Sequence, residues 1–302
     1  MDTNILLESG TNEVEVLEFT LGNNHYGINV AKIREISQYE KVTPVPNSHP
    51  SVEGIYMPRD TMITVIDLRS CLGMEREGEK GLFIITNFNK LNIAFHIDQV
   101  IGIHKVSWEE IIKPDSTINT EGSSVATGVV KMKDRLIVIL DFESIVSSIS
   151  PETGLRVADI DTLEARNRSD SCIIIAEDSP LLCKLITECL RKAGYQDLII
   201  TANGQEAWDK ILEKKNAGTL LDDIQCIITD IEMPQMDGHR LTKLCKSDEV
   251  IKNIPLVIFS SLVNDEMRRK GEQLGADAQL TKPEIGMLVD AIDKLIAGVP
   301  VK

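Results

Sequence analysis

The 302 residues are enough for about two domains, and the 42% of hydrophobic residues can fill two cores of a folded protein. No apolar stretch approaches the roughly 20 residues of a membrane span, and residues 1–10 lack the features of a signal peptide, so we expect a cytoplasmic protein without direct membrane insertion. The formal net charge is −15, with 14 basic and 25 acidic side chains in residues 1–165, which argues against nucleic acid as a partner because binding to its phosphates needs a basic surface.

The first half of the chain consists of short strand-like segments separated by turn-forming residues. Residues 14–21 and 26–30 alternate between apolar and polar positions on either side of Gly22, which predicts a β-hairpin. Strands of this length and spacing are typical of small β-barrels. The other expected strands are 63–68, 82–86, 92–97, 102–106 and 136–140, and the expected short helices are 31–35 and 142–147.

Residues 1–150 contain no recognisable catalytic arrangement. The histidines are scattered, no Ser, Cys or Asp is placed with them as a nucleophile system, and no glycine-rich loop could bind a phosphate. We therefore interpret this half as a binding module and not as an enzyme.

A linker is predicted between the two halves. Residues 147–154 read SSISPETG, a composition typical of a flexible connection, and a short helix is expected at 159–166. The predicted boundaries are 12–148 for the first domain, 149–170 for the linker and 171–298 for the second domain.

The second half alternates apolar strands with helices, which predicts an α/β fold with a parallel sheet. Residues 172–176 form a continuous apolar run of the kind that such a sheet buries on both faces. The six cysteines of the chain show no C-x-x-C pair and no zinc-site spacing, so we expect reduced thiols. The other strands are expected at 226–229, 256–259 and 277–281, and the helices at 180–193, 204–215, 238–246, 265–274 and 284–297.

Polar side chains follow these predicted strands at their carboxyl ends. Glu177 and Asp178 follow the first strand, Asp230 the second, Ser260 the third and Lys282 the last. Because the carboxyl ends of parallel strands meet at one edge of the sheet, the five side chains should converge on one crevice. Each also has an ordinary structural explanation, since a strand-end Asp often caps a helix and a Lys before Pro often lies in a solvated loop. Together, three crowded carboxylates favour a site for a hard cation such as Mg²⁺, which relieves their repulsion.

Four motifs of the second half resemble the receiver domain of two-component response regulators, over residues 171–298. They are Ala-Glu-Asp at 176–178, Thr-Asp-Ile-Glu-Met-Pro-Gln-Met-Asp-Gly at 229–238, Phe-Ser-Ser at 259–261 and Thr-Lys-Pro at 281–283. The resemblance implies a flavodoxin-like (βα)5 domain. One departure is Gln279, which stands where many receivers carry an aromatic switch residue, so the usual aromatic readout is in question.

The receiver resemblance also implies a role for each residue of the crevice. Asp230 would be the nucleophile that accepts a phosphoryl group, Lys282 would bind the phosphoryl oxygens, and Ser260 would sense that the site is occupied. Mg²⁺ would be held by Glu177, Asp178, Asp230 and the backbone carbonyl of Glu232.

The first half contains the segments FTLG at 19–22, YGINV at 26–30, IREI at 33–36, VPN at 45–47, VEGI at 52–55 and VIDL at 65–68. In their order and spacing, across about residues 12–148, they resemble the CheW coupling protein of bacterial chemotaxis. The resemblance implies two joined β-barrels that link chemoreceptors to the histidine kinase CheA. At residues 57–60 the chain reads Met-Pro-Arg-Asp where CheW proteins tend to read Asn-Leu-Arg-Gly, and Arg59 aligns with a loop arginine implicated in coupling contacts. A solvated surface charge is the alternative for Arg59.

A CheW-like domain followed by a receiver is similar to the CheV family. This resemblance implies a multidomain, non-enzymatic adaptor that is recruited to membrane receptor arrays and modulated by phosphorylation of Asp230. The alternative is a phosphate sink, in which the receiver drains phosphoryl groups from the kinase by rapid autodephosphorylation. The lifetime of the phosphoryl group would discriminate between the two.

Overall fold

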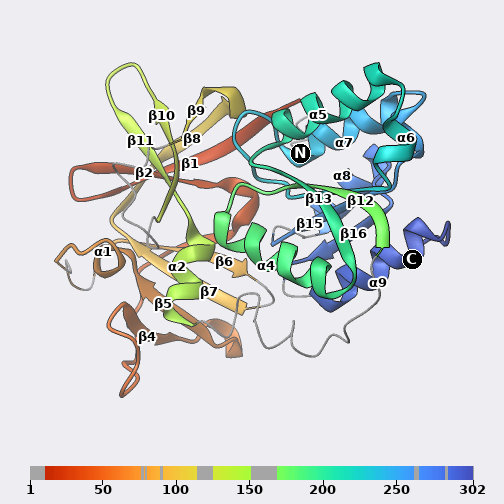
Figure 1. The fold of residues 1–302 in the computed structure, drawn as a ribbon. Helices are drawn as coiled ribbons and strands as arrows, with labels where there is room; N and C mark the ends of the chain where they lie inside the picture. Colours follow the sequence, from red (N-terminus) through yellow and green to blue (C-terminus); the bar gives the residue numbers. More distant parts are fainter. Residues whose placement is uncertain are drawn as a thin grey trace. The chain divides into compact units, whose positions relative to one another are not determined.

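The computed structural model describes residues 11–75, 78, 80–88, 91–113, 125–150, 169–261, 265–282 and 285–301. The described residues form two compact units, of which the first contains 14–150 and the second contains 11–13 together with all those from 169 onward. The first unit is built mainly from β-strands and the second is α/β (Figure 1), which confirms the predicted multidomain fold class. The predicted helix at 159–166 lies outside the described residues.

The first unit contains two β-sheets. The six-stranded sheet has the order β8-β1-β2-β11-β10-β9, and the five-stranded sheet has the order β3-β6-β7-β5-β4. The strands are β1 Glu13–Leu21, β2 Asn24–Asn29, β3 Ile33–Gln38, β4 Val52–Tyr56, β5 Ile63–Asp67, β6 Leu82–Phe88, β7 Leu91–Ile97, β8 Gln99–Ser107, β9 Ile111–Ile112, β10 Ala126–Lys131 and β11 Leu136–Leu140. The helices are α1 Leu68–Cys71 and α2 Phe142–Ile149, with 3₁₀ turns η1 Val30–Lys32, η2 Pro58–Asp60 and η3 Trp108–Glu110.

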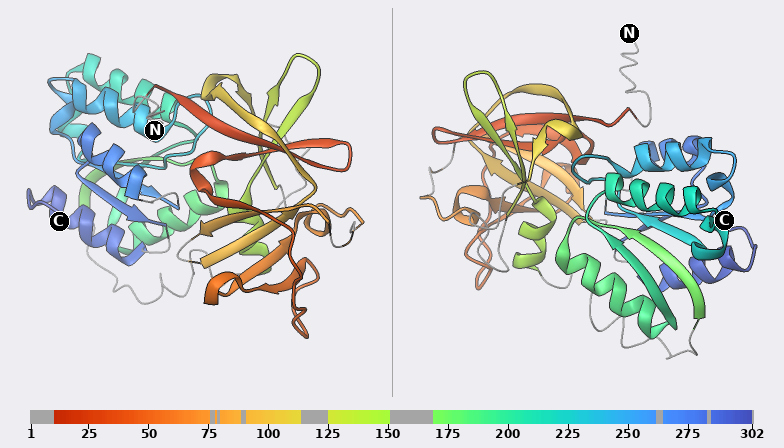
Figure 2. Two further views of the ribbon diagram at one scale, coloured as in Figure 1. Left: turned by 180° about the vertical axis from the view of Figure 1, so that it is seen from behind. Right: turned by 45° about the horizontal axis from the view of Figure 1, so that its top comes forward.

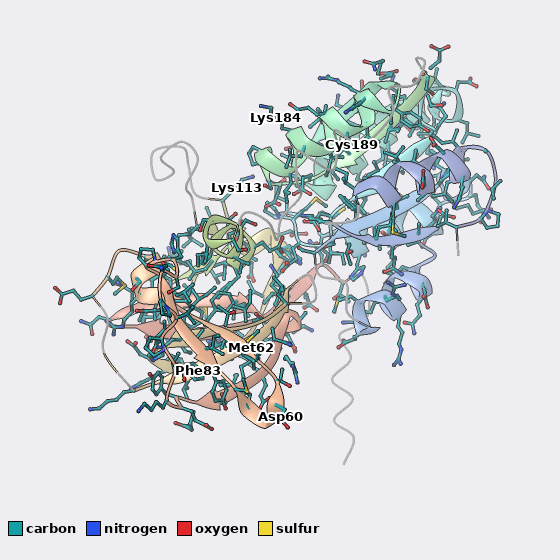
Figure 3. All side chains as sticks on the ribbon, turned by 90° about the horizontal axis from the view of Figure 1, so that it is seen from below. Asp60, Met62, Phe83, Lys113, Lys184 and Cys189 are labelled. Carbon is teal, nitrogen blue, oxygen red and sulfur yellow. The ribbon has the colours of Figure 1, made fainter. Side chains whose placement is uncertain are left out.

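Three apolar clusters hold the first unit together. One is formed by side chains from strands of the six-stranded sheet and includes Val16 and Ile137. A second lies inside the five-stranded sheet around Phe83, which is labelled in Figure 3. The third joins the two sheets, because it combines side chains of both with Phe142 and its neighbours on α2. Both faces of β1 are therefore buried, and Phe19 contributes to the joining cluster.

The predicted hairpin is confirmed. Strands β1 and β2 pair antiparallel, with Phe19 opposite Tyr26, and Gly22 turns the chain with a φ of 61° that a residue with a Cβ rarely adopts. The predicted helix at 142–147 is also confirmed as α2.

The helix predicted at 31–35 is wrong. Only the 3₁₀ turn η1 forms there, and β3 begins at Ile33. Strand β3 pairs antiparallel with β6, where Ile36 lies opposite Ile84. This long-range pairing provides the backbone hydrogen bonds that a helix would otherwise make internally, so tertiary context overrides the local pattern. The other strands that sequence analysis did not single out are β4, β9, β10 and β13.

A buried carboxylate lies between four neighbouring strands of the six-stranded sheet. Glu18 of β1 is 0% exposed, and its carboxylate accepts two hydrogen bonds from the Arg135 guanidinium, at 2.7 and 2.9 Å. His25 Nδ1 and His104 Nε2 each lie 2.6 Å from the same carboxylate. The Arg135 hydrogen bonds lower the pKa of Glu18 to about 2, although burial opposes them. The ionised form of Glu18 therefore stabilises this sheet.

We expect Glu18→Gln to destabilise the first unit by about 2 kcal/mol at neutral pH, because it leaves Arg135 without its buried anionic partner. The pKa of Glu18 is 4.5 without the fold and about 2 in it. Ionised Glu18 therefore stabilises the folded unit fully above pH 4.5, and this contribution is lost as the pH falls toward about 2. Wild type should therefore lose more stability than Glu18→Gln over this interval. Urea unfolding followed by Trp108 fluorescence, in a Trp208→Phe background, reports the unfolding free energy of the first unit alone. The control is Glu40→Gln, the same substitution at an exposed position.

The second unit is a five-stranded parallel sheet with the order β13-β12-β14-β15-β16. Helices α4 and α9 pack on one face, and α5, α7 and α8 lie on the other (Figures 1 and 2). The elements are β12 Ser169–Ala176, α4 Pro180–Lys192, β13 Tyr195–Thr201, α5 Gly204–Ala217, α6 Leu220–Asp223, β14 Cys226–Thr229, α7 Gly238–Ser247, η5 Ile251–Asn253, β15 Leu256–Ser260, α8 Asp265–Leu274, β16 Ala278–Thr281 and α9 Ile285–Ile296.

The α/β pattern predicted for the second half is confirmed, with helix ends within a few residues of those expected. On α4, Cys189 is fully buried against the sheet whereas Lys184 is exposed (Figure 3). All six cysteines are free thiols in the structure, and all of them except the half-buried Cys71 are buried. Within the described part of the chain, none of the helices has the length and apolar character needed to cross a membrane.

Candidate functional site

The predicted polar residues meet at the carboxyl edge of the parallel sheet. Glu177 and Asp178 follow β12, Asp230 follows β14, Ser260 is the last residue of β15, and Lys282 follows β16. These four strands are consecutive neighbours in the sheet, so their ends form one continuous edge. The structure therefore brings together all five side chains that sequence analysis placed in one crevice.

Lys282 lies between two buried carboxylates. Its Nζ is 2.7 Å from Asp230 Oδ2 and 3.1 Å from Glu177 Oε2. The three residues are only 4–6% exposed. Backbone amides also hold the carboxylates, because Ile231 N–H donates to Asp230 Oδ1 at 2.6 Å and Ser179 N–H donates to Glu177 Oε1 at 3.1 Å. Asp230 is thus oriented before any ligand arrives.

The electrostatics of the site suit a cation. Burial raises the pKa of Glu177, the negative charges of Asp230 and Asp178 raise it further, and Lys282 opposes them. Ligand atoms of Glu177, Asp178 and Asp230 all lie within 4.8 Å of one another. Carboxylate oxygens at this spacing are the donors that Mg²⁺ prefers, so the residues present fit the predicted metal. The individual roles of these residues stay predictions.

Ser260 and Glu232 lie beside this cluster. Ser260 is 1% exposed, stands opposite Thr281 in the β15–β16 pairing, and accepts a hydrogen bond from Lys282 N–H through its carbonyl at 3.3 Å. Ser260 and Lys282 are therefore connected through the backbone of two neighbouring strands. Glu232 is half-buried in the loop that runs from β14 to α7.

The start of α7 packs closely on the end of β14. Asp237 caps α7 by accepting a hydrogen bond from Arg240 N–H, and Gly238 N–H donates to the Ile231 carbonyl at 2.9 Å. A Cβ on Gly238 would lie 1.8 Å from the Asp230 carbonyl oxygen. Only glycine therefore allows this approach, and the Asp-Gly pair in the motif after β14 was the sequence signal for it.

Gln279 lies on β16, at the position where sequence analysis noted a difference from many receivers. Its side chain lies against α8, where its Nε2 donates to the Arg268 carbonyl at 2.8 Å. A Cβ on Gly271 of α8 would lie 2.3 Å from Gln279 Oε1, so the glycine leaves room for the amide in this position. Gln279 Oε1 is buried and has no hydrogen-bond partner among the described residues. The residue that departs from the receiver pattern in the sequence, Gln279, therefore makes a polar contact with α8.

Arg59 lies in the turn η2 of the first unit, and its side chain is outside the described residues. The neighbouring Met57 and Met62 are 61% and 63% exposed. Asp60 and Met62 are labelled at this end of the first unit in Figure 3. The coupling role of Arg59 stays a prediction.

In comparisons with known proteins, each unit matches the model of a different domain family. Residues 15–150 match the CheW-like domain, and residues 173–293 match the response regulator receiver domain. Chemotaxis protein CheV3 of Helicobacter pylori is 28% identical over 282 residues, which cover 90% of this chain and 88% of CheV3. CheV2 of the same organism is 28% identical over 309 residues, covering 95% and 96%. CheW of Thermotoga maritima is 28% identical over 151 residues, covering 49% and 98%. The chain therefore joins a CheW-like domain to a response regulator receiver domain, and over most of its length it is similar to chemotaxis proteins of the CheV type.

Proposed function

We propose that this protein couples chemoreceptors to the histidine kinase CheA and that phosphorylation of its receiver domain at Asp230 modulates the coupling. The observation that carries the proposal is the buried contact of Lys282 with Asp230 and Glu177 at the edge of a receiver sheet. That site is in the same chain as a CheW-like domain. The names of the relatives, which are chemotaxis proteins CheV and CheW, support the choice of partners.

The transfer step follows from the orientation of Asp230. One carboxylate oxygen attacks the phosphorus of a kinase phosphohistidine, a phosphorus–oxygen bond forms, and the phosphorus–nitrogen bond breaks as the imidazole keeps the electron pair and takes up a proton. Lys282 moves from its carboxylate partners to the phosphoryl oxygens. Mg²⁺, held by Glu177, Asp178, Asp230 and the Glu232 carbonyl, would neutralise charge on the transferred group.

The modulation is a population shift between two receiver conformations. The phosphoryl group adds charge at Asp230, Ser260 senses it, and the face formed by β15, α8 and β16 changes its preferred arrangement. Gln279 contacts α8 on this face, so it is placed to respond. A coupling free energy of about 1–3 kcal/mol would change partner affinity from several-fold to about a hundredfold.

In this proposal the protein is an adaptor, and its only chemistry is transfer to and loss of the phosphoryl group from its own receiver. It acts in the cytoplasm, where binding to chemoreceptors would bring it to the membrane arrays.

Intact-protein mass spectrometry should show a phosphoryl adduct on the wild-type chain after incubation with acetyl phosphate and Mg²⁺. Chelation of Mg²⁺ with EDTA should reduce its formation at least tenfold, because the charge of the phosphoryl group is then not neutralised. The decay of the adduct after removal of the donor distinguishes the two functions. If the phosphoryl group stays on the protein long enough to alter its complexes with receptors and CheA, the adaptor function is supported. If the phosphoryl group is lost rapidly, the phosphate sink is supported. If neither acetyl phosphate nor CheA phosphohistidine yields an adduct, the modulation by phosphorylation is refuted.

A further inference from the structure

A side chain from the beginning of the sequence holds the loop that follows the phosphoryl acceptor. Asn12 belongs to the receiver unit although it lies 225 residues before Asp237. Its Nδ2 donates to the Gln235 carbonyl at 2.7 Å, and its Oδ1 accepts from Asp237 N–H at 3.0 Å. Asn12 is only 7% exposed. The amide therefore uses its donor and its acceptor on two residues of one loop, and we call this arrangement the Asn12 clamp.

The clamped loop contains backbone groups that need partners. Gln235 has a φ of 65°, in the left-handed region that residues with a Cβ seldom adopt. Asp237 is the N-cap of α7 and is 6% exposed, so its own N–H is outside the helix ladder and shielded from water. A buried amide of this kind needs an acceptor, and Asn12 provides it. The loop conformation thus depends on a residue outside the receiver sequence motif.

The clamp is connected to Asp230 by a short chain of backbone contacts. Gly238, next to Asp237, donates its N–H to the Ile231 carbonyl at 2.9 Å. Ile231 N–H in turn donates to Asp230 Oδ1 at 2.6 Å. A displacement of residues 235–237 would therefore move the amide that orients the nucleophilic carboxylate.

We propose that Asn12 is a positioning residue for phosphoryl transfer to Asp230, and this inference rests on the proposed function. Asn12 touches neither the donor nor the reacting atoms and acts through residues 235–238. The segment just before β1 is in this sense part of the receiver's phosphorylation machinery.

The test uses the full chain with Asn12→Ala, Asn12→Asp and a matched control, Asn23→Ala, at an exposed position of the β1–β2 turn. Adduct formation is followed by intact mass over a range of acetyl phosphate concentrations with Mg²⁺. Asn12→Ala should lower the maximal rate roughly tenfold, the effect of one or two lost hydrogen bonds, without raising the half-saturating concentration. Asn12→Asp keeps the acceptor for Asp237 N–H but sets a carboxylate oxygen against the Gln235 carbonyl, so its maximal rate should fall at least as far as that of Asn12→Ala. Asn23→Ala should behave as wild type.

Hydrogen exchange of the same proteins gives a second readout. In Asn12→Ala the amides of residues 231–238 should exchange faster than in wild type, whereas those of residues 256–260 in β15 should not change. If the loop exchanges faster but the adduct forms at the wild-type rate, Asn12 is merely structural and the proposal is overturned. It is equally overturned if Asn12→Ala matches Asn23→Ala in both measurements. Absence of an adduct on wild type would instead refute the proposed function itself. If Asn12→Ala does not fold, Asn12→Asp provides the same comparison.

Discussion

Asp230→Asn is expected to bind receptors and CheA as wild type does but to show no response to phosphorylation. The carboxamide is neutral and a poor nucleophile, so adduct formation with acetyl phosphate should fall at least a hundredfold. The CheW-like domain is a separate compact unit, so its binding should not change. The measurement is the activity of CheA in complex with receptors and this protein, before and after phosphoryl donors are added.

The control for this experiment is Asp222→Asn, the same chemical change on the exposed surface of α6. It should form the adduct and modulate the kinase as wild type does. A response to phosphorylation that persists in Asp230→Asn would show that the signal does not pass through this residue. A loss of coupling before any phosphorylation would mean that Asp230 supports the scaffold itself.

Gly238→Ala is expected to have the second largest effect. The added Cβ would lie 1.8 Å from the Asp230 carbonyl oxygen and 2.9 Å from Thr229 Oγ1, so the loop or α7 must shift. We expect the receiver to lose about 3 kcal/mol of unfolding free energy, as for other overpacked buried positions, and adduct formation to slow more than tenfold. Urea unfolding followed by Trp208 in a Trp108→Phe background reports on the receiver unit.

A matched control is Gly286→Ala in α9, where the added Cβ would meet no atom within 4 Å. Alanine is the better helix former, so this variant should keep or gain up to about 1 kcal/mol of stability and form the adduct normally. If Gly238→Ala is as stable and as reactive as Gly286→Ala, the close approach of α7 to the acceptor strand has no functional importance.

The receiver site could be predicted from local patterns. The apolar run of β12 and the short runs of β14 and β15 each end directly before a polar residue, and parallel strands bring those ends to one edge. Edge and irregular strands were harder to recognise. Strand β13 alternates poorly between buried and exposed positions, and Ile200 on it is 50% exposed, so the two-sided apolar signal is missing. Strand β3 likewise exposes Ile36 at the edge of its sheet.

Buried charge was not visible in the sequence either. Glu18 lies in an alternating β-strand pattern that ordinarily directs a polar residue to solvent. Its partners His25, His104 and Arg135 come from three other strands or their ends. Only the pairing of β8, β1, β2 and β11 as neighbours shows that the polar residue is enclosed.

By itself the sequence determined the α/β pattern of the second half and the residues at its strand ends, because those depend on short apolar runs and on the residue that follows each of them. The CheW-like and receiver domain types were indicated by the resemblance of their motifs to known families. Tertiary structure alone decided the contacts that complete the site. The Asn12 clamp joins residues 225 positions apart, and Gln279 meets α8 only because Gly271 leaves room for its amide. Such contacts depend on which distant backbone groups remain without partners after folding, and local periodicity carries no information about them.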